Sequence, residues 1–186
     1  MPTSQEATNE AAAIASLYVQ ALRQGQALWF RVASGSMHPT LRIGEEVRIE
    51  PARAKQLRVG EIAAFETAQG LIIHRIVQCQ LDGVSTQLTE MSDVHLRASH
   101  VDEQAVVGRV VAIRHGKHSI DLQHPLAKKC GAVTASLRFR LYQVHTNHSF
   151  MPSILSKCSR VVVRICNVCI RLCCSSSIPE APGLDI

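Results

Sequence analysis

The chain has 186 residues, which is enough for one domain with a substantial core and too few to predict two. Hydrophobic residues make up 46% of the chain, as in an ordinary globular protein, while an aromatic content of only 4% argues against a stacking surface for single-stranded nucleic acid. The formal net charge is +5, and the excess lies in the C-terminal third, because residues 123–176 contain no Asp or Glu.

Cysteine usage and the N-terminus bear on location. The seven cysteines are an odd number and five of them crowd into residues 158–174, which does not fit a secreted disulfide framework. The N-terminus has no basic-then-apolar run like that of a signal peptide, and no apolar stretch reaches the ~18 to 20 residues needed to span a bilayer. These features predict a cytoplasmic protein or one peripheral to the cytoplasmic membrane face. The cysteines are Cys79, Cys130, Cys158, Cys166, Cys169, Cys173 and Cys174.

Residues 1–27 are predicted to form an N-terminal amphipathic helix, over residues 4–24. Apolar residues recur there at helical spacing, and Gly25 can end the helix. Thr3 and Glu6 have the spacing of a capping box. We expect this helix to pack on the domain, the alternative being docking on a partner or a membrane. The apolar positions are Ile14, Leu17, Tyr18, Ala21 and Leu22.

From residue 28 the pattern changes to short strand-like runs separated by glycine turns. Seven such runs predict a mainly β domain over residues 28–122, a curled sheet or partial barrel. The predicted strands are Leu28–Ala33, Glu45–Glu50, Glu61–Glu66, Leu71–Gln80, Val84–Thr89, Ala105–Arg114 and His118–Leu122.

Residues 123–174 form a basic, cysteine-containing segment predicted to be helical, with one helix possible over 126–145 and a second over 157–174. On a helical wheel, the second has one cationic face and an apolar side that we place opposite it. This pattern favours a membrane-surface helix, with a strand-forming or poorly ordered tail as the competitor. Residues 175–186 are predicted to be disordered. The cationic positions are Lys157, Arg160, Arg164 and Arg171, and the apolar ones are Val161, Ile165, Val168, Cys169 and Leu172.

Two residues carry the candidate chemistry. Ser36 lies in a turn bounded by glycine and proline, and His74 lies inside the apolar strand Leu71–Gln80. A serine hydroxyl becomes a nucleophile when a neighbouring base removes its proton, and imidazole is a base that is largely unprotonated near neutral pH. Strand alternation places His74 on the same face as Ile72 and Ile76. Each residue alone has an ordinary structural explanation, a turn serine and a core histidine, so it is the combination that suggests a site.

The order of several short motifs makes the combination specific. Ser-Gly-Ser-Met-His-Pro-Thr-Leu at 34–41 is followed by Gly-Glu-Glu-Val at 44–47, Gly-Glu-Ile at 60–62 and Ile-His-Arg-Ile-Val at 73–77. Over residues 29–122 this pattern resembles the signal peptidase I and LexA-like superfamily of serine peptidases (S24/S26), in the branch that uses a histidine base. The resemblance implies a sheet of the signal peptidase and LexA type.

The resemblance also implies roles for individual residues. Ser36 would be the nucleophile, His74 the general base, and Asp93 the acidic group that orients the imidazole. The hydroxyl of Ser34 and the backbone N–H of Ser36 would stabilise the oxyanion. The chain departs from the family pattern at Ser92, where the family has glycine, which weakens the assignment of Asp93; a solvated loop carboxylate is the alternative.

The sequence therefore predicts a signal peptidase-like serine peptidase that cleaves a leader or signal segment, needs no cofactor or metal and binds no nucleic acid. Cys166 and Cys169 have a zinc-like spacing, but no second pair follows at the usual distance. One alternative is an inactive peptide-binding module on the same fold. Another is a self-cleaving LexA-like regulator, which lacks support because no DNA-binding helix-turn-helix precedes the domain.

Overall fold

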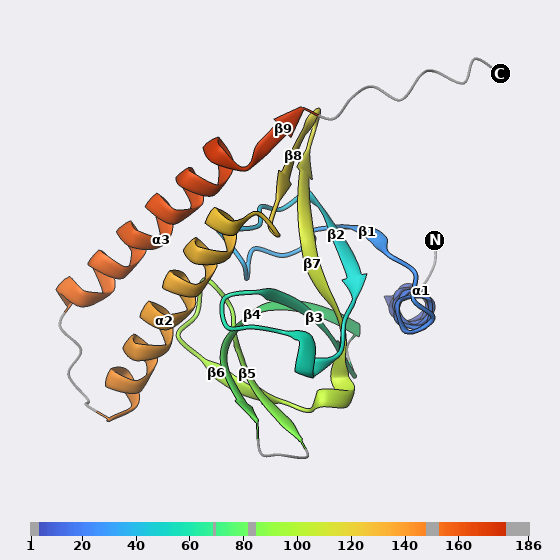
Figure 1. Ribbon diagram of the computed structural model, residues 1–186. Coiled ribbons are helices and arrows are strands. Elements are labelled where there is room, and N and C mark those ends of the chain that lie inside the picture. Colours follow the sequence, from blue (N-terminus) through green and yellow to red (C-terminus); the bar gives the residue numbers. More distant parts are fainter. Residues whose placement is uncertain (1–3, 69, 82–84, 148–152, 178–186) are drawn as a thin grey trace.

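The computed structural model describes residues 4–68, 70–81, 85–147 and 153–177, and these form a mainly antiparallel, open β-sheet with helices packed against it (Figure 1). The prediction of a mainly β domain with an N-terminal helix is confirmed. Two single-turn 3-10 helices, η1 (Ala54–Gln56) and η2 (Glu103–Ala105), lie between strands. The strands are β1 (Leu28–Arg31), β2 (Glu46–Pro51), β3 (Ile62–Thr67), β4 (Gly70–Leu81), β5 (Thr86–Met91), β6 (Ala98–Val101), β7 (Val106–His115), β8 (His118–Asp121) and β9 (Ser175–Ser177).

The strand order is β1-β2-β7-β3-β4-β5-β6, with β8 paired to β7 and β9 to β8. Within this order β4 pairs with β3 from Gly70 to Arg75 and with β5 only from Arg75 onward. Among the described residues, the segment 70–74 is therefore hydrogen-bonded on one edge alone. This half-paired stretch contains His74.

All seven predicted strands are present, and two strands were missed. The segment Ala98–Val101 pairs with β5 although its side chains show no apolar alternation, because it is the main-chain pairing with β5 that makes it a strand. Ser175–Ser177 pairs with β8, so the prediction of disorder is wrong for these three residues. The rest of that predicted tail, 178–186, lies outside the described residues, as does the proposed cap residue Thr3.

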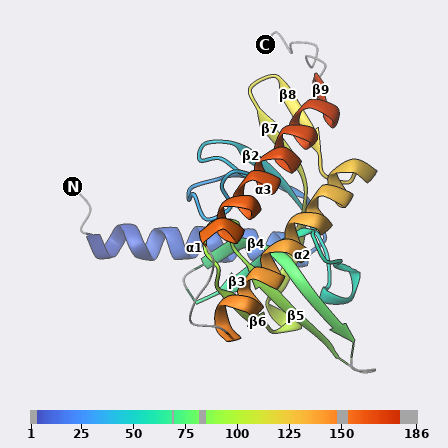
Figure 2. The same ribbon diagram turned by 90° about the vertical axis from the view of Figure 1, so that its left-hand side faces the viewer.

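Helix α1 (Ser4–Arg23) crosses the edge of the sheet and extends beyond it (Figure 2). Val19 and Leu22 are buried in the core, and the Arg23 guanidinium donates to Glu66 Oε2 at 2.7 Å. The ring of Tyr18 meets that of Phe30 edge-on, with 5.0 Å between centroids. The predicted packing of this helix on the domain is thus what the structure has.

Helices α2 (Pro125–Asn147) and α3 (Ser153–Cys173) lie side by side against one side of the sheet (Figures 1 and 2). Ala135 of α2 packs against Val77 and Met91, and Ile170 of α3 belongs to the core of β2 and β7. The C-terminal helices therefore contribute to the hydrophobic packing of the sheet at two separate clusters. No described helix is long and apolar enough to cross a membrane.

The faces of α3 differ from the predicted ones. Val163, Cys166 and Ile170 form the face that packs on the protein, whereas the apolar residues placed opposite the arginines are largely exposed. A helix of about 3.6 residues per turn puts these exposed residues beside the arginines rather than across from them. The exposed residues are Val161, Ile165, Val168 and Leu172.

Candidate active site

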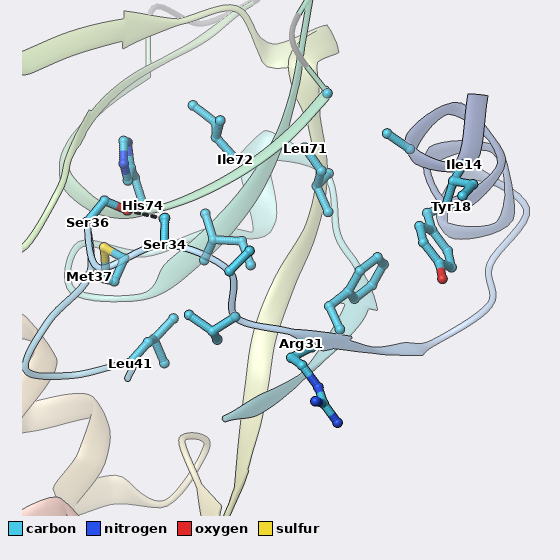
Figure 3. Close-up of a pocket in the computed structure, with 16 residues that line it drawn as sticks. Ile14, Tyr18, Arg31, Ser34, Ser36, Met37, Leu41, Leu71, Ile72 and His74 are labelled. Carbon is cyan, nitrogen blue, oxygen red and sulfur yellow. Dashed lines mark hydrogen bonds between the residues drawn. The ribbon is translucent and has the colours of Figure 1, made fainter. Parts of the chain in front are cut away.

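A cavity of about 590 Å³ opens between α1, the chain from Phe30 to Met37 and the half-paired part of β4 (Figure 3). Its walls are mainly apolar, with Tyr18, Leu71 and Ile73 among them, and polar groups come from a few residues. Ser36 and His74, which are 38 positions apart in the chain, both line it. A concave apolar site with a few convergent polar groups is the usual form of a ligand site.

Buried residues directly after Ser36 hold the turn in place. Met37 is 2% exposed and Leu41 1% exposed, so both anchor the loop in the core. The N–H of Val94 donates to the carbonyl of Ser36 at 3.1 Å, which ties the loop after β5 to this turn. The peptide bond between His38 and Pro39 is cis. The Oγ atoms of Ser34 and Ser36 lie 3.3 Å apart, and this is the hydrogen bond that the Ser36 hydroxyl makes.

The imidazole of His74 has a carboxylate partner, and it is Glu90. His74 Nδ1 lies 2.6 Å from Glu90 Oε2, and the glutamate side chain is only 8% exposed. When Nδ1 carries the proton and donates it to this carboxylate, Nε2 is left as the basic nitrogen. In a catalytic triad, a carboxylate contacts the imidazole in this way and orients it.

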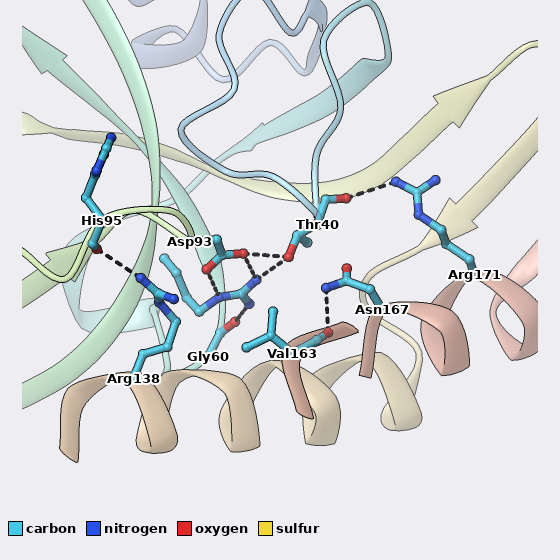
Figure 4. A network of polar contacts seen from close by, with 9 residues as sticks. Thr40, Gly60, Asp93, His95, Arg138, Val163, Asn167 and Arg171 are labelled. Atoms are coloured by element: carbon cyan, nitrogen blue, oxygen red, sulfur yellow. Dashed lines mark hydrogen bonds and ion pairs between the residues drawn. The ribbon is translucent and has the colours of Figure 1, made fainter. Parts of the chain in front are cut away.

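Asp93 does not fill the orienting role that the sequence predicted. Its carboxylate accepts from Arg75, with Nε 2.9 Å from Oδ1 and Nη2 2.6 Å from Oδ2, and from the hydroxyl of Thr40 (Figure 4). No hydrogen bond or ion pair among the described residues joins it to His74. Arg75 and His74 are successive residues of a strand and point to opposite faces, so a carboxylate bound to Arg75 faces away from the imidazole.

The group of Thr40, Arg75 and Asp93 is a buried ion pair with its hydrogen bonds satisfied. Arg75 also donates to the carbonyl of Gly60 at 2.8 Å and to Thr40 Oγ1 at 2.9 Å. Burial alone would raise the pKa of the Asp93 carboxyl, but the charge and hydrogen bonds of Arg75, together with the Thr40 hydroxyl, hold that pKa below its ordinary value. This group fixes the Ser36 loop, through Thr40, to the strand that carries His74.

The C-terminal helices hold the same loop from the other side. Arg171 of α3 donates to both oxygens of the buried Glu45, at 2.9 and 3.1 Å, and to the carbonyl of Thr40 at 3.1 Å. Gly60, just before β3, lies against α2: a Cβ built on Gly60 would come within 2.3 Å of the backbone nitrogen of Ala132, so the two backbones are in direct contact. The turn after Ser36 thus depends on α3 directly, and on α2 only through Gly60, whose carbonyl accepts from the Arg75 guanidinium that binds Thr40.

Ser34, Ser36 and His74 are thus brought to one cavity, while Asp93 is held in a separate network. No hydrogen bond between Ser36 and His74 is present among the contacts of the described residues. The sequence analysis missed Glu90. The signal was a glutamate in the strand Thr86–Met91, opposite Ile76 in the ladder and therefore a diagonal neighbour of His74 on the same face, which becomes visible only once the register is known.

The described part of the chain contains no cluster of His, Cys, Asp or Glu that could hold a metal ion, and the cysteines whose side chains are described, Cys79, Cys130, Cys166, Cys169, Cys173 and Cys174, are free thiols. Burial, followed by the neighbouring thiol of Cys166, raises the pKa of Cys130 to about 11. Cys130 is therefore a poor nucleophile at neutral pH.

Comparison with known proteins does not assign the chain to a family: no protein-family model matches it, and no curated protein matches its sequence.

Proposed function

We propose that the chain is a serine endopeptidase similar to signal peptidase I, with a sheet of the signal peptidase and LexA type, and that it removes a leader or signal segment from a peptide. The observation that carries this proposal is that Ser36 and His74 line the same apolar cavity, with Glu90 bound to Nδ1 of the imidazole. Acyl transfer of this kind uses a nucleophile, a base and a group that orients the base.

The mechanism follows from these positions. A bound peptide excludes water from the cavity, and rotation of the Ser36 side chain away from Ser34 brings its hydroxyl to His74. His74 Nε2 takes the proton as Ser36 Oγ attacks the carbonyl carbon, and then gives that proton to the leaving amine. The Ser36 N–H and the Ser34 hydroxyl donate to the oxyanion. A water molecule, deprotonated by His74, then attacks the acyl carbon, the ester bond to Ser36 Oγ breaks, and His74 returns the proton to that oxygen as the acyl group leaves as a carboxylate.

The substrate is proposed to bind as an added strand. Residues 70–74 of β4 have an edge that no described strand occupies, and this edge borders the cavity. An extended peptide can pair with such an edge through main-chain hydrogen bonds, while alternate side chains enter the cavity. Leu71 and Ile73 offer apolar walls, which suit small apolar residues beside the scissile bond.

The test is labelling with a serine-directed acylating probe, followed by mass mapping and a cleavage assay on a leader-like peptide. We expect the label on Ser36, loss of both labelling and cleavage in Ser36→Ala, and retention of both in the control Ser99→Ala on β6. Ser34→Ala should slow cleavage without abolishing it, by on the order of 100-fold or more, as for one oxyanion donor. Cleavage by the Ser36→Ala protein at the unchanged rate would refute the proposal.

A second candidate is a peptide-binding module without turnover on the same fold. It is favoured by one observation, the hydrogen bond of the Ser36 hydroxyl to Ser34 in place of His74. In that case a leader peptide would bind with equal affinity to the wild type and to Ser36→Ala, and the probe would label neither. Calorimetric titration of the peptide together with the labelling experiment separates the two functions.

A further inference from the structure

A second cavity, of about 230 Å³, lies between the turn after Ser36 and the helices α2 and α3. Three arginines and a histidine contribute to its lining, and the single acidic residue there is Asp93, whose carboxylate is already bound by Arg75 and Thr40. The cavity is therefore cationic. Its lining residues are His38, Pro39, Asp93, Val94, Arg138, Arg160, Val163 and Arg164.

Arg138 is the buried cation of this cavity. It is 5% exposed, and although its Nη2 donates to the carbonyl of His95 at 2.9 Å, its buried Nε has no hydrogen-bond partner (Figure 4). A buried donor without a partner costs free energy, which an anion in the cavity would recover. Arg160 and Arg164 are exposed and stand one turn apart on α3. Guanidinium groups arranged in this way suit the oxygens of a phosphate.

An exposed apolar stripe on α3 runs beside these arginines. Val161, Ile165, Val168 and Leu172 are 55%, 56%, 55% and 76% exposed. Their spacings of four, three and four residues place them on one face, and at about 100° per residue that face adjoins the one bearing Arg160 and Arg164. Large aliphatic side chains in a row on an otherwise folded surface mark a site that another surface covers.

Charge decides what covers the stripe. Residues 123–176 contain no acidic residue, so α3 of a second copy would bring arginine against arginine. An anionic membrane offers an apolar layer with phosphates at its boundary. The apolar layer matches the exposed stripe of α3, and the phosphates match the arginines that adjoin it.

We propose that α3 docks on an anionic phospholipid surface, with the stripe Val161, Ile165, Val168 and Leu172 in the apolar layer and a lipid headgroup phosphate in the cavity of Arg138, Arg160 and Arg164. The site is independent of the proposed peptidase chemistry. Because His38 and Pro39 form one of its walls, a bound headgroup lies against the turn that carries Ser36.

The experiment is co-sedimentation of the full chain with vesicles of phosphatidylcholine alone and with vesicles that also contain phosphatidylglycerol. We expect binding to the anionic vesicles that falls with added salt, and weak binding to the neutral ones. Arg160→Gln with Arg164→Gln should weaken binding to the anionic vesicles about thirtyfold, since each arginine near such a surface raises the binding constant roughly fivefold. Val168→Ser with Leu172→Ser should weaken it about tenfold or more.

The matched control is Arg53→Gln with Lys55→Gln, which removes the same charge from exposed positions beside η1 and should leave binding within about twofold. Equal binding to neutral and anionic vesicles would overturn the proposal, as would wild-type binding by the Arg160 and Arg164 double variant. A third arm measures the melting temperature with inorganic phosphate. Stabilisation that needs Arg160 and Arg164, without any vesicle binding, would show a free phosphate ligand and would also overturn the membrane proposal.

Discussion

The two faces of β4 carry opposite kinds of polar group. On one face, His74 lines an open apolar cavity and its imidazole is bound by Glu90, and the histidine side chain is 20% exposed. On the other, one residue further along, Arg75 and Asp93 are sealed under α2, with side chains 4% and 0% exposed. Both pairs join a basic residue to an acidic one, yet only the first leaves a nitrogen free to act on a ligand. Accessibility, rather than the presence of a charged pair, separates a chemical site from a structural one.

The carboxylates of these two pairs, Glu90 and Asp93, are three residues apart in the chain. Replacing each of them separately is the sharpest test of the comparison. Glu90→Gln should lower the proposed peptidase rate by about 1,000- to 10,000-fold, because a neutral amide neither favours the Nδ1–H tautomer of His74 nor stabilises the imidazolium. The measurement is kcat on a leader-like peptide. The free energy of unfolding should change far less than it does when the Asp93 carboxylate is removed.

Glu50→Gln, on the exposed side of β2, is the control for that variant and should keep the wild-type rate. If Glu90→Gln proved fully active while a folded Asp93 variant lost all activity, the assignment of roles to the two faces would have to be reversed.

Removing the carboxylate on the sealed face should act on stability instead. Asp93→Leu leaves the buried Arg75 guanidinium unpaired and should cost about 3 to 5 kcal/mol in the free energy of unfolding. The double variant Asp93→Leu with Arg75→Met should recover a large part of that loss, since neither charge remains. Urea unfolding of the wild type, Asp93→Leu, Arg75→Met and the double variant gives the coupling free energy, and additive losses would contradict the buried pair.

The pH dependence of stability provides a third test. The pKa of Asp93 is lower in the folded chain than in the unfolded one, so the pair contributes stability that is fully present above the ordinary carboxyl pKa of about 4 and is lost as the pH falls through the lower, folded value. Thermal melts from neutral to acid pH should show this loss in the wild type, and a smaller one in Asp93→Asn. Equal acid sensitivity of the two proteins would rule out Asp93 as the cause.

Thr40→Val should have the smallest effect of the four. The hydroxyl accepts from Arg75 and donates to Asp93, but these two residues keep their own hydrogen bonds without it. The expected loss is about 1 to 2 kcal/mol in urea unfolding. A loss as large as that of Asp93→Leu would mean that Thr40, and not the ion pair, holds the Ser36 loop.

Local patterns in the sequence were enough to predict much of this molecule. The apolar run at residues 71–77 predicted a strand, whose geometry places His74 and Ile76 on one face, and the helical spacing up to Leu22 predicted α1. The turn at Ser36 was also recognisable from its glycine and proline. These features depend on neighbours within a few positions, which a sequence displays directly.

The remaining features depend on pairing across the chain. Glu90 is assigned to His74 by the ladder between β4 and β5, and Asp93 to Arg75 by the loop that follows, so sequence order alone could not say which carboxylate meets the imidazole. The faces of α3 were predicted from apolar character, whereas its real core face includes Asn167, which is buried because its amide donates to the carbonyl of Val163.

The backbone contact between Gly60 and α2 limits where this protein can be truncated. The carbonyl of Gly60 holds Arg75, and a Cβ built on the facing Gly131 would come within 2.7 Å of that same oxygen. A fragment ending at residue 122 would keep every strand from β1 to β8 and still lose the wall against which Gly60 rests and the cation that neutralises Glu45. Shortened versions for crystallisation or engineering should therefore retain both C-terminal helices.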